Sequence, residues 1–253
     1  MKSAIKNLIL DAQGMLNDES QRLLKDDMRD TVQAITLLSN IGNGANRISE
    51  IGSRAGKEAC SITEPLAKVR DLSFVEREVP FGKSLEKSKK GIYHIKDSLL
   101  SFLYRFVIPY QSVLELGRYD TVMNIIEEQF TQYLDLCWKK LCRNYVSGNT
   151  IDGIAYKVAS RWWDKIFPEG SKEGEMRALD VVAESFDKKH LLIGECKWTK
   201  EEDAERLEKK LQESIPYLPF IKRRQKVHIV LFLKEPPLHQ NENCVFLPKD
   251  ILS

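Results

Sequence analysis

Two strand-like segments that carry charged residues in apolar surroundings constrain the fold of this chain most strongly. Residues 178–183 contain Asp180, and residues 190–198 contain Glu195 and Lys197. A short polar turn joins the segments, which predicts an antiparallel hairpin. Pairing the strands would bring two carboxylates and one ammonium together. Because an unpaired carboxylate buried in a sheet is costly, such charges indicate either a functional site or an internal ion pair.

An acid and an E-x-K sequence on adjacent strands form the arrangement of metal-dependent nucleases. We expect Asp180, Glu195 and the carbonyl of Cys196 to bind Mg²⁺ or Mn²⁺, since hard cations prefer oxygen ligands. Lys197 would act as a catalytic cation that either orients the attacking water or stabilises the transition state at the phosphate. In the alternative interpretation, Glu195 and Lys197 form a structural ion pair and no metal binds.

The cysteines indicate a reducing compartment. There are five, with no C-x-x-C pair, which argues against a zinc or disulfide framework and predicts a cytoplasmic protein. Strand alternation points Cys196 away from Glu195 and Lys197, so we expect a small core residue and not a nucleophile. No apolar run reaches the length of a membrane span, and the amino terminus lacks the pattern of a secretory signal.

The first hundred residues have the element order of a winged helix-turn-helix. Apolar spacing predicts helices at residues 20–38, 46–56 and 58–72, and strands at 74–79 and 92–95. The loop between these strands carries four lysines and one opposing acid, Glu86. The lysines are either solvated or in contact with a nucleic acid backbone, and their clustering favours nucleic acid. They are Lys83, Lys87, Lys89 and Lys90.

The second half of the chain changes from helical to mixed. Residues 98–147 are rich in apolar residues at helical spacing. After residue 148, strands are expected at 159–163, 227–233 and 244–247, in addition to the charged hairpin, with a charged helix at 200–214. Residues 227–233 are apolar almost throughout, as in a strand covered on both faces.

Several strings resemble, in the same order, the carboxy-terminal region of prokaryotic and archaeal DEXX-box P-loop ATPases. They are GANRISEI (44–51), VEREVP (75–80), GIYHIKD (91–97), FLYRFV (102–107), RWW (161–163) and GECKW (194–198). The resemblance implies an α/β (α+β) chain, in which a winged helix precedes a PD-(D/E)XK restriction-endonuclease-like mixed sheet flanked by helices. We expect a winged helix domain with an amino-terminal helical extension at 1–97, a helical connector at 98–147 and the nuclease-like domain at 148–253. The helix at 120–146 should pack on the nuclease-like domain.

The chain departs from this family in three places. It has no Walker A loop, so no ATPase activity is expected. It is either a fragment that begins after the ATPase module or a stand-alone relative. Lys139 stands where the family often has an acid on the helix before the sheet, and Ala178 replaces a second acid. Asp135 could substitute for the missing acid or pair with Lys139, and the i,i+4 spacing favours the pair.

Two functions follow from these observations. The first is a Mg²⁺-dependent deoxyribonuclease acting on double-stranded or branched DNA. The second is a catalytically inactive nuclease-like fold that serves as the DNA- or protein-binding module of an ATPase, in cis or in trans. A winged-helix transcription regulator would account for residues 30–96 and leave the second half unexplained.

Overall fold

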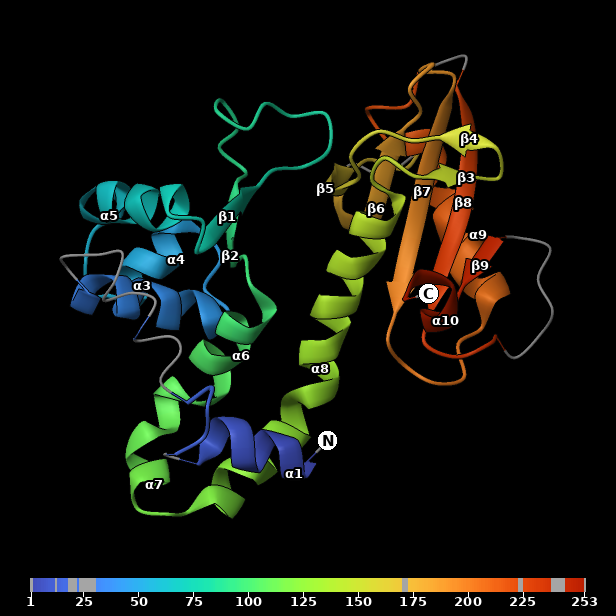
Figure 1. Cartoon of the computed structure of the whole chain (residues 1–253). Helices are drawn as coiled ribbons and strands as arrows, with labels where there is room; N and C mark the ends of the chain where they lie inside the picture. The colour runs from blue at the N-terminus through green and yellow to red at the C-terminus, as the bar shows by residue number, and fades with distance from the viewer. Residues whose placement is uncertain are drawn as a thin grey trace. The chain divides into compact units, whose positions relative to one another are not determined.

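The computed structural model describes residues 2–11, 13–17, 22, 31–169, 173–222, 225–237 and 244–252 (Figure 1). Contacts divide the chain into two units. The first comprises Met1–Glu78 and Ser88–Phe130, and the second Val79–Lys87 and Thr131–Ser253. The longest helix, α8 (Tyr119–Val146), contributes to both. Within the described ranges, none of the helices combines the length and the apolar character needed to span a membrane.

The first unit consists of helices and one short hairpin. In the hairpin, β1 (Val75–Glu78) pairs antiparallel with β2 (Ile92–Ile95). Three helices followed by this hairpin reproduce the predicted element order, although residues 20, 21 and 23–30 of the predicted first helix lie outside the described residues. The helices are α1 (Lys2–Ile5), η1 (Lys6–Leu10), α3 (Thr31–Gly42), α4 (Ile48–Arg54), α5 (Ala59–Asp71), α6 (Ser98–Phe106), η2 (Ile108–Tyr110) and α7 (Gln111–Glu115).

Local signals fix the ends of these helices. The Asp97 carboxylate accepts a hydrogen bond from the Leu100 N–H at 2.9 Å and caps α6, because the first turn of a helix leaves its N–H groups unpaired. Helix α3 ends at Gly42, and Gly44 follows at φ +94°. Only glycine adopts that backbone conformation without strain.

A five-stranded mixed sheet forms the centre of the second unit (Figure 1). The order is β5-β6-β7-β8-β9, with antiparallel pairing at the first two junctions and parallel pairing at the last two. The parallel pair β7–β8 needs a crossover, which α9 supplies. The strands are β5 (Ser160–Ile166), β6 (Glu175–Glu184), β7 (His190–Lys197), β8 (Lys226–Leu233) and β9 (Cys244–Phe246); the helices are α9 (Ala204–Ser214), η3 (Ile215–Tyr217) and α10 (Pro248–Ile251).

Strand alternation divides the core of this sheet between two faces. On β7, Leu192 and Cys196 are buried in one core with Trp138 of α8, while Leu191 and Ile193 are buried in the other. The second core includes Leu211 of α9 and Leu218. The sheet is therefore covered by a helix on each face, and the predicted mixed α/β architecture is confirmed at this level.

A separate two-stranded hairpin adds to the face that α8 covers. Strands β3 (Thr150–Ile151) and β4 (Ile154–Ala155) are joined by Asp152 and Gly153, at φ +50° and +76°. An Asp-Gly pair with positive φ at both positions is the preferred two-residue hairpin turn. Ile151 and Tyr156 from this segment complete the first core.

Candidate functional site

An irregularity in β6 determines where Asp180 points. On β5 Ser160 and Trp162 are two positions apart, while their partners on β6, Val182 and Leu179, are three apart, which is the signature of a β-bulge. Regular pairing of β6 with β7 begins only at Val181. Asp180 lies within the bulge, and a bulge redirects side chains away from the regular alternation.

The Asp180 carboxylate is buried and hydrogen-bonded. It is 7% exposed, and its Oδ2 accepts a hydrogen bond from the backbone N–H of Cys196 at 3.1 Å. The predicted hairpin thus does bring the first acid to the E-x-K segment. Contact occurs through the backbone of Cys196.

Helix α8 presents a cation to the same carboxylate. The ammonium nitrogen of Lys139 lies 2.9 Å from Oδ2 of Asp135 and 3.5 Å from Oδ1 of Asp180. The i,i+4 pair expected from the sequence is therefore present. Oδ1 of Asp135 accepts a hydrogen bond from the Trp198 N–H at 3.3 Å, which ties the helix to the end of β7.

The electrostatic environment keeps Lys139 protonated. Burial alone would lower the pKa of its ammonium, but the carboxylates of Asp180 and Asp135 outweigh burial and raise the pKa above its ordinary value. One turn further along α8, Arg143 donates from Nη1 to the backbone carbonyl of Asp180 at 3.2 Å. Arg143 was not among the residues singled out from the sequence. Its spacing of four residues from Lys139, which is itself four from Asp135, was the signal that could have identified it.

Glu195 and Lys197 form the second ion pair of the site. Their Oε1 and Nζ atoms are 2.9 Å apart. The pKa of Lys197 is raised because its attraction to Glu195 and then Asp180 exceeds the effect of burial, while Lys139 opposes the rise. Asp180, Glu195 and Lys197, singled out from the sequence, thus lie within electrostatic reach of one another. We call Asp135, Lys139, Asp180, Glu195 and Lys197 the charge cluster.

As arranged, the charge cluster does not fit a divalent cation. The Lys139 ammonium faces one carboxylate oxygen of Asp180, and the Cys196 N–H donates a hydrogen bond to the other. Lys197 forms an ion pair with Glu195. Mg²⁺ demands near-octahedral coordination by oxygen atoms, several of them carboxylate or water oxygens. Across the described ranges, His, Cys, Asp and Glu side chains nowhere form a group of three or more that could hold a metal ion.

Two other positions named from the sequence, the side chain of Cys196 and Ala178, are not part of the charge cluster. The thiol of Cys196 is fully buried in the core, and burial together with Cys142 raises its pKa well above the ordinary value. A thiol in that state is a poor nucleophile. Ala178 is exposed and opposite Trp163 on β5.

The four lysines of the predicted wing are all exposed. Lys83 and Lys87 lie in the segment assigned to the second unit, and Lys89 and Lys90 in the first. Phe81 anchors the former segment: its N–H donates to the Arg161 carbonyl at 2.7 Å, and its ring contacts that of Phe220.

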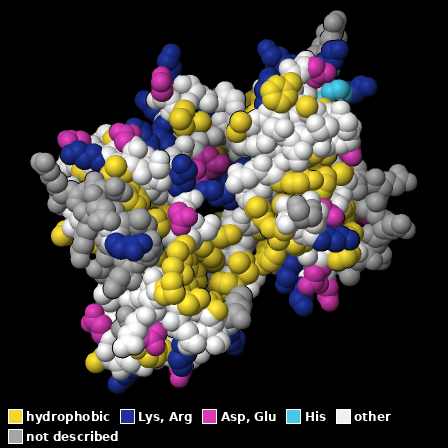
Figure 2. All heavy atoms as spheres, viewed as in Figure 1, with side chains coloured by type: hydrophobic (Ala, Val, Ile, Leu, Met, Phe, Trp, Pro, Cys, Tyr) yellow, Lys and Arg dark blue, Asp and Glu magenta, His cyan; other side chains and the backbone are white. Residues whose placement is uncertain are grey.

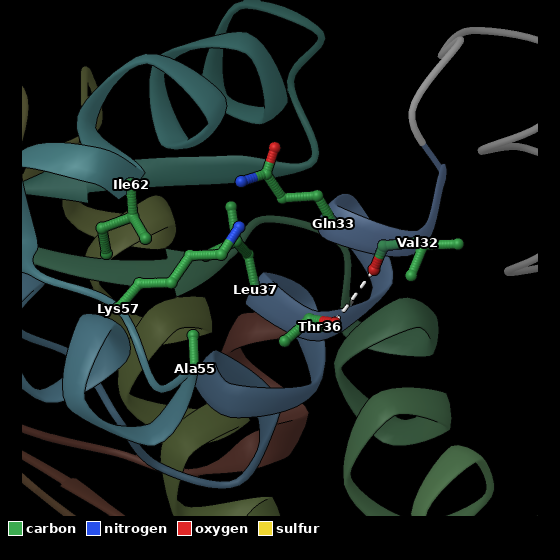
Figure 3. Close-up of a pocket in the computed structure, with 7 residues that line it drawn as sticks. All are labelled: Val32, Gln33, Thr36, Leu37, Ala55, Lys57 and Ile62. Atoms are coloured by element: carbon green, nitrogen blue, oxygen red, sulfur yellow. Dashed lines mark hydrogen bonds between the residues drawn. The ribbon is translucent and has the colours of Figure 1, made fainter.

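Two cavities lie away from the charge cluster. One, of about 370 Å³, lies in the first unit beside α3 and α5. Figure 3 shows the Lys57 and Gln33 side chains extending over it and Ile62 and Leu37 beside them. The other, of about 240 Å³, lies in the second unit, where His228 of β8 lines it. Neither is lined by a residue of the charge cluster.

Comparison with known proteins gives a family similarity without an activity. Residues 103–209 match the profile of DUF234, described as archaeal and bacterial proteins of unknown function. The chain is also 28% identical over 186 residues to Uncharacterized protein MJECL04 of Methanocaldococcus jannaschii. That match covers 72% of this chain and 39% of the relative, so the chain spans about two fifths of the relative's length.

Two solved structures resemble the chain loosely. Protein VC1899 from Vibrio cholerae has a TM-score of 0.31 at 12% identity, covering 95% of this chain and 55% of that protein. The SdaI restriction endonuclease has a TM-score of 0.27 at 15% identity, covering 90% of this chain and 87% of that enzyme. Both scores are below 0.5, so neither comparison decides the fold or the activity of this chain.

Proposed function

We propose that this chain is a DNA-binding protein whose second unit has a PD-(D/E)XK-like fold and acts as a binding module without hydrolysing phosphodiester bonds. The position of Lys139 carries this proposal. Its ammonium takes the place beside Asp180 that a divalent cation would need, and it supplies positive charge there permanently. The negative charges of the carboxylates are thereby balanced by lysine side chains of the chain itself.

DNA contact is assigned to the basic wing and the helices that precede it. Three helices and a hairpin are the elements of a winged helix, and exposed lysines near the hairpin suit the phosphate backbone. By its resemblance to the DEXX-box proteins, the module would act with a P-loop ATPase, in cis or in trans. Fold alone does not decide function, so these assignments rest on the lysines and the charge cluster.

A Mg²⁺- or Mn²⁺-dependent nuclease is the second candidate. One observation favours it: Lys197 interacts with both Glu195 and Asp180. In this reading Asp180, Glu195 and the Cys196 carbonyl remain the metal ligands and Lys197 the catalytic cation. It requires Lys139 to move away from Asp180.

A combined binding and cleavage assay separates the two candidates. Duplex DNA binding is measured by fluorescence anisotropy, Mn²⁺ binding by calorimetry, and cleavage by nicking of a supercoiled plasmid with Mg²⁺ or Mn²⁺. We expect DNA binding without metal binding or nicking, and weaker DNA binding when Lys83, Lys87, Lys89 and Lys90 are replaced by alanine. Metal-dependent nicking that disappears in both Glu195→Ala and Lys197→Ala would instead establish the nuclease.

A further inference from the structure

Three segments distant in sequence meet at the end of the sheet opposite the charge cluster. The β6–β7 turn follows Glu184, residue 157 lies beside it, and residues 222, 225 and 226 precede or begin β8. Backbone hydrogen bonds hold them together: the Lys157 N–H donates to the Glu184 carbonyl, and the Lys226 N–H donates to the Lys189 carbonyl, both at 2.9 Å. This end of the sheet is therefore a single, fixed surface.

Glu184 organises the side chains at this surface. Its carboxylate accepts hydrogen bonds from Lys157 at 2.8 Å, Lys222 at 2.5 Å and the Gln225 amide at 3.2 Å. Gln225 also donates to the Lys188 carbonyl at 3.2 Å. Hydrogen bonds from the two lysines lower the pKa of Glu184 to about 2, so the carboxylate stays ionised and keeps both cations in place.

The surface carries more positive than negative charge. Lys188, Lys189, Lys222 and Lys226 are exposed, and with Lys157 they make five lysines against the carboxylates of Glu184 and Asp187. Figure 2 shows lysine and arginine side chains gathered at the upper right, over the end of the sheet where β6 meets β7 in Figure 1. Like charges held this close repel one another, which favours an anionic partner.

An exposed aromatic residue lies among these lysines. Phe186 is 62% exposed, and its backbone N–H donates to the Ala155 carbonyl at 3.1 Å, which fixes the turn that carries it. A flat apolar ring between cations suits a nucleobase attached to a phosphate backbone, because every base has a face that can stack. A lipid surface can also take up an exposed ring beside lysines, so binding to anionic vesicles is a separate outcome of the test.

We infer that Phe186 and the lysines at positions 157, 188, 189, 222 and 226, here called the basic surface, bind single-stranded nucleic acid. The lysines contact the phosphodiester backbone and Phe186 stacks on a base. This inference rests on the proposed DNA-binding function and adds a second contact surface, separate from the wing lysines. It also assigns a binding role to the β6–β7 turn, which contributes no residue to the charge cluster.

The test compares matched charge reversals in the full chain. Lys188→Glu/Lys189→Glu changes the basic surface, and Lys209→Glu/Lys210→Glu makes the same change on an exposed adjacent pair of α9. Binding of a labelled single-stranded oligonucleotide is measured by anisotropy over a range of salt concentrations. We expect the first variant to bind at least about tenfold more weakly, while the α9 variant keeps wild-type affinity. The slope of log affinity against log salt concentration should become shallower by about two in the first variant.

A second pair of variants tests stacking. Phe186→Ala is expected to weaken single-strand binding by about fivefold or more, and Phe186→Tyr, which keeps the ring, to leave it unchanged. If the wild type and both charge variants bind the single strand equally well while the wing variant still loses duplex binding, the inference about the basic surface is wrong. The proposed function is then unaffected. Failure of the wild type to bind any DNA would overturn the proposed function as well. Binding to anionic vesicles that Lys188→Glu/Lys189→Glu abolishes, with DNA binding unaffected, would assign the surface to a membrane instead.

Discussion

The ammonium of Lys139 and the carboxylate of Asp180 meet at 3.5 Å where helix α8 covers the sheet. Asp180 is the least exposed acid of the charge cluster, and Lys139 is its cationic side-chain partner there. Removing one member of a buried ion pair leaves the other uncompensated, which costs far more than the pair contributes. This contact is therefore the most sensitive point of the site.

Replacing Lys139 with methionine should destabilise the protein. Lys139→Met keeps much of the packing volume but leaves Asp180 buried without its cation, and we expect a loss of about 2–4 kcal/mol in the free energy of unfolding. Urea denaturation measures it. Lys209→Met, at an exposed position of α9, should change the same quantity by less than about 0.5 kcal/mol. Equal values for the two variants would show that Asp180 does not depend on Lys139.

Replacing Lys139 with an acid should create affinity for a divalent cation. In Lys139→Glu, carboxylates at 135, 139 and 180 would face one another, so the metal-free variant should be less stable than the wild type. Mn²⁺ should restore its stability, because a ligand that binds only the folded state raises the melting temperature. Differential scanning fluorimetry with and without Mn²⁺ checks this. The wild type and Lys139→Arg, which keeps the positive charge, should show no such shift.

Gly194 should tolerate no larger residue. A Cβ atom at this position would lie 3.0 Å from Cε2 of Phe232 and 3.1 Å from Cβ of Val181. Because these neighbours are core residues of the sheet, Gly194→Ala should cost about 1–3 kcal/mol through overpacking. Chemical denaturation measures the loss, and an alanine variant as stable as the wild type would contradict the close packing of Gly194 against Phe232 and Val181.

The Glu184 network should make stability depend on acidity. The pKa of Glu184 is lowered from 4.5 to about 2 by hydrogen bonds from Lys157 and Lys222. A carboxyl group with a lower pKa in the folded state stabilises the fold above its unfolded pKa and loses this contribution as pH falls through the folded pKa. The stability difference between wild type and Glu184→Gln should be largest near neutral pH and shrink as the pH falls from about 4.5 towards 2. A difference that is constant across this range would contradict the assignment.

Periodicity in the sequence was sufficient for the regular elements. The hairpin of β6 and β7 was predictable because apolar runs flank a short polar turn, and the apolar run at 227–233 corresponds to β8 (Lys226–Leu233). The Asp135–Lys139 pair followed from helical spacing alone. These features depend on residues close together in the chain or on a simple repeat.

The remaining features depend on contacts that a sequence pattern does not encode. The bulge in β6 arises from pairing with β5 and β7 together, and it sends Asp180 to the Cys196 N–H. The short hairpin of β3 and β4 was not predicted, although Asp152-Gly153 was a turn signal. The Glu184 network joins residues 157, 184 and 222, whose separation in sequence gave no sign of their proximity.

Strand β7 sets the distance between the basic surface and the charge cluster. Its eight residues run from His190 beside the lysines to Lys197, a span of roughly 23 Å at about 3.3 Å per residue. This is more than two Debye lengths at physiological salt, where the Debye length is about 8 Å. A change of charge on the basic surface therefore leaves the ion pairs of the charge cluster unperturbed, and the two ends of the strand can be altered independently.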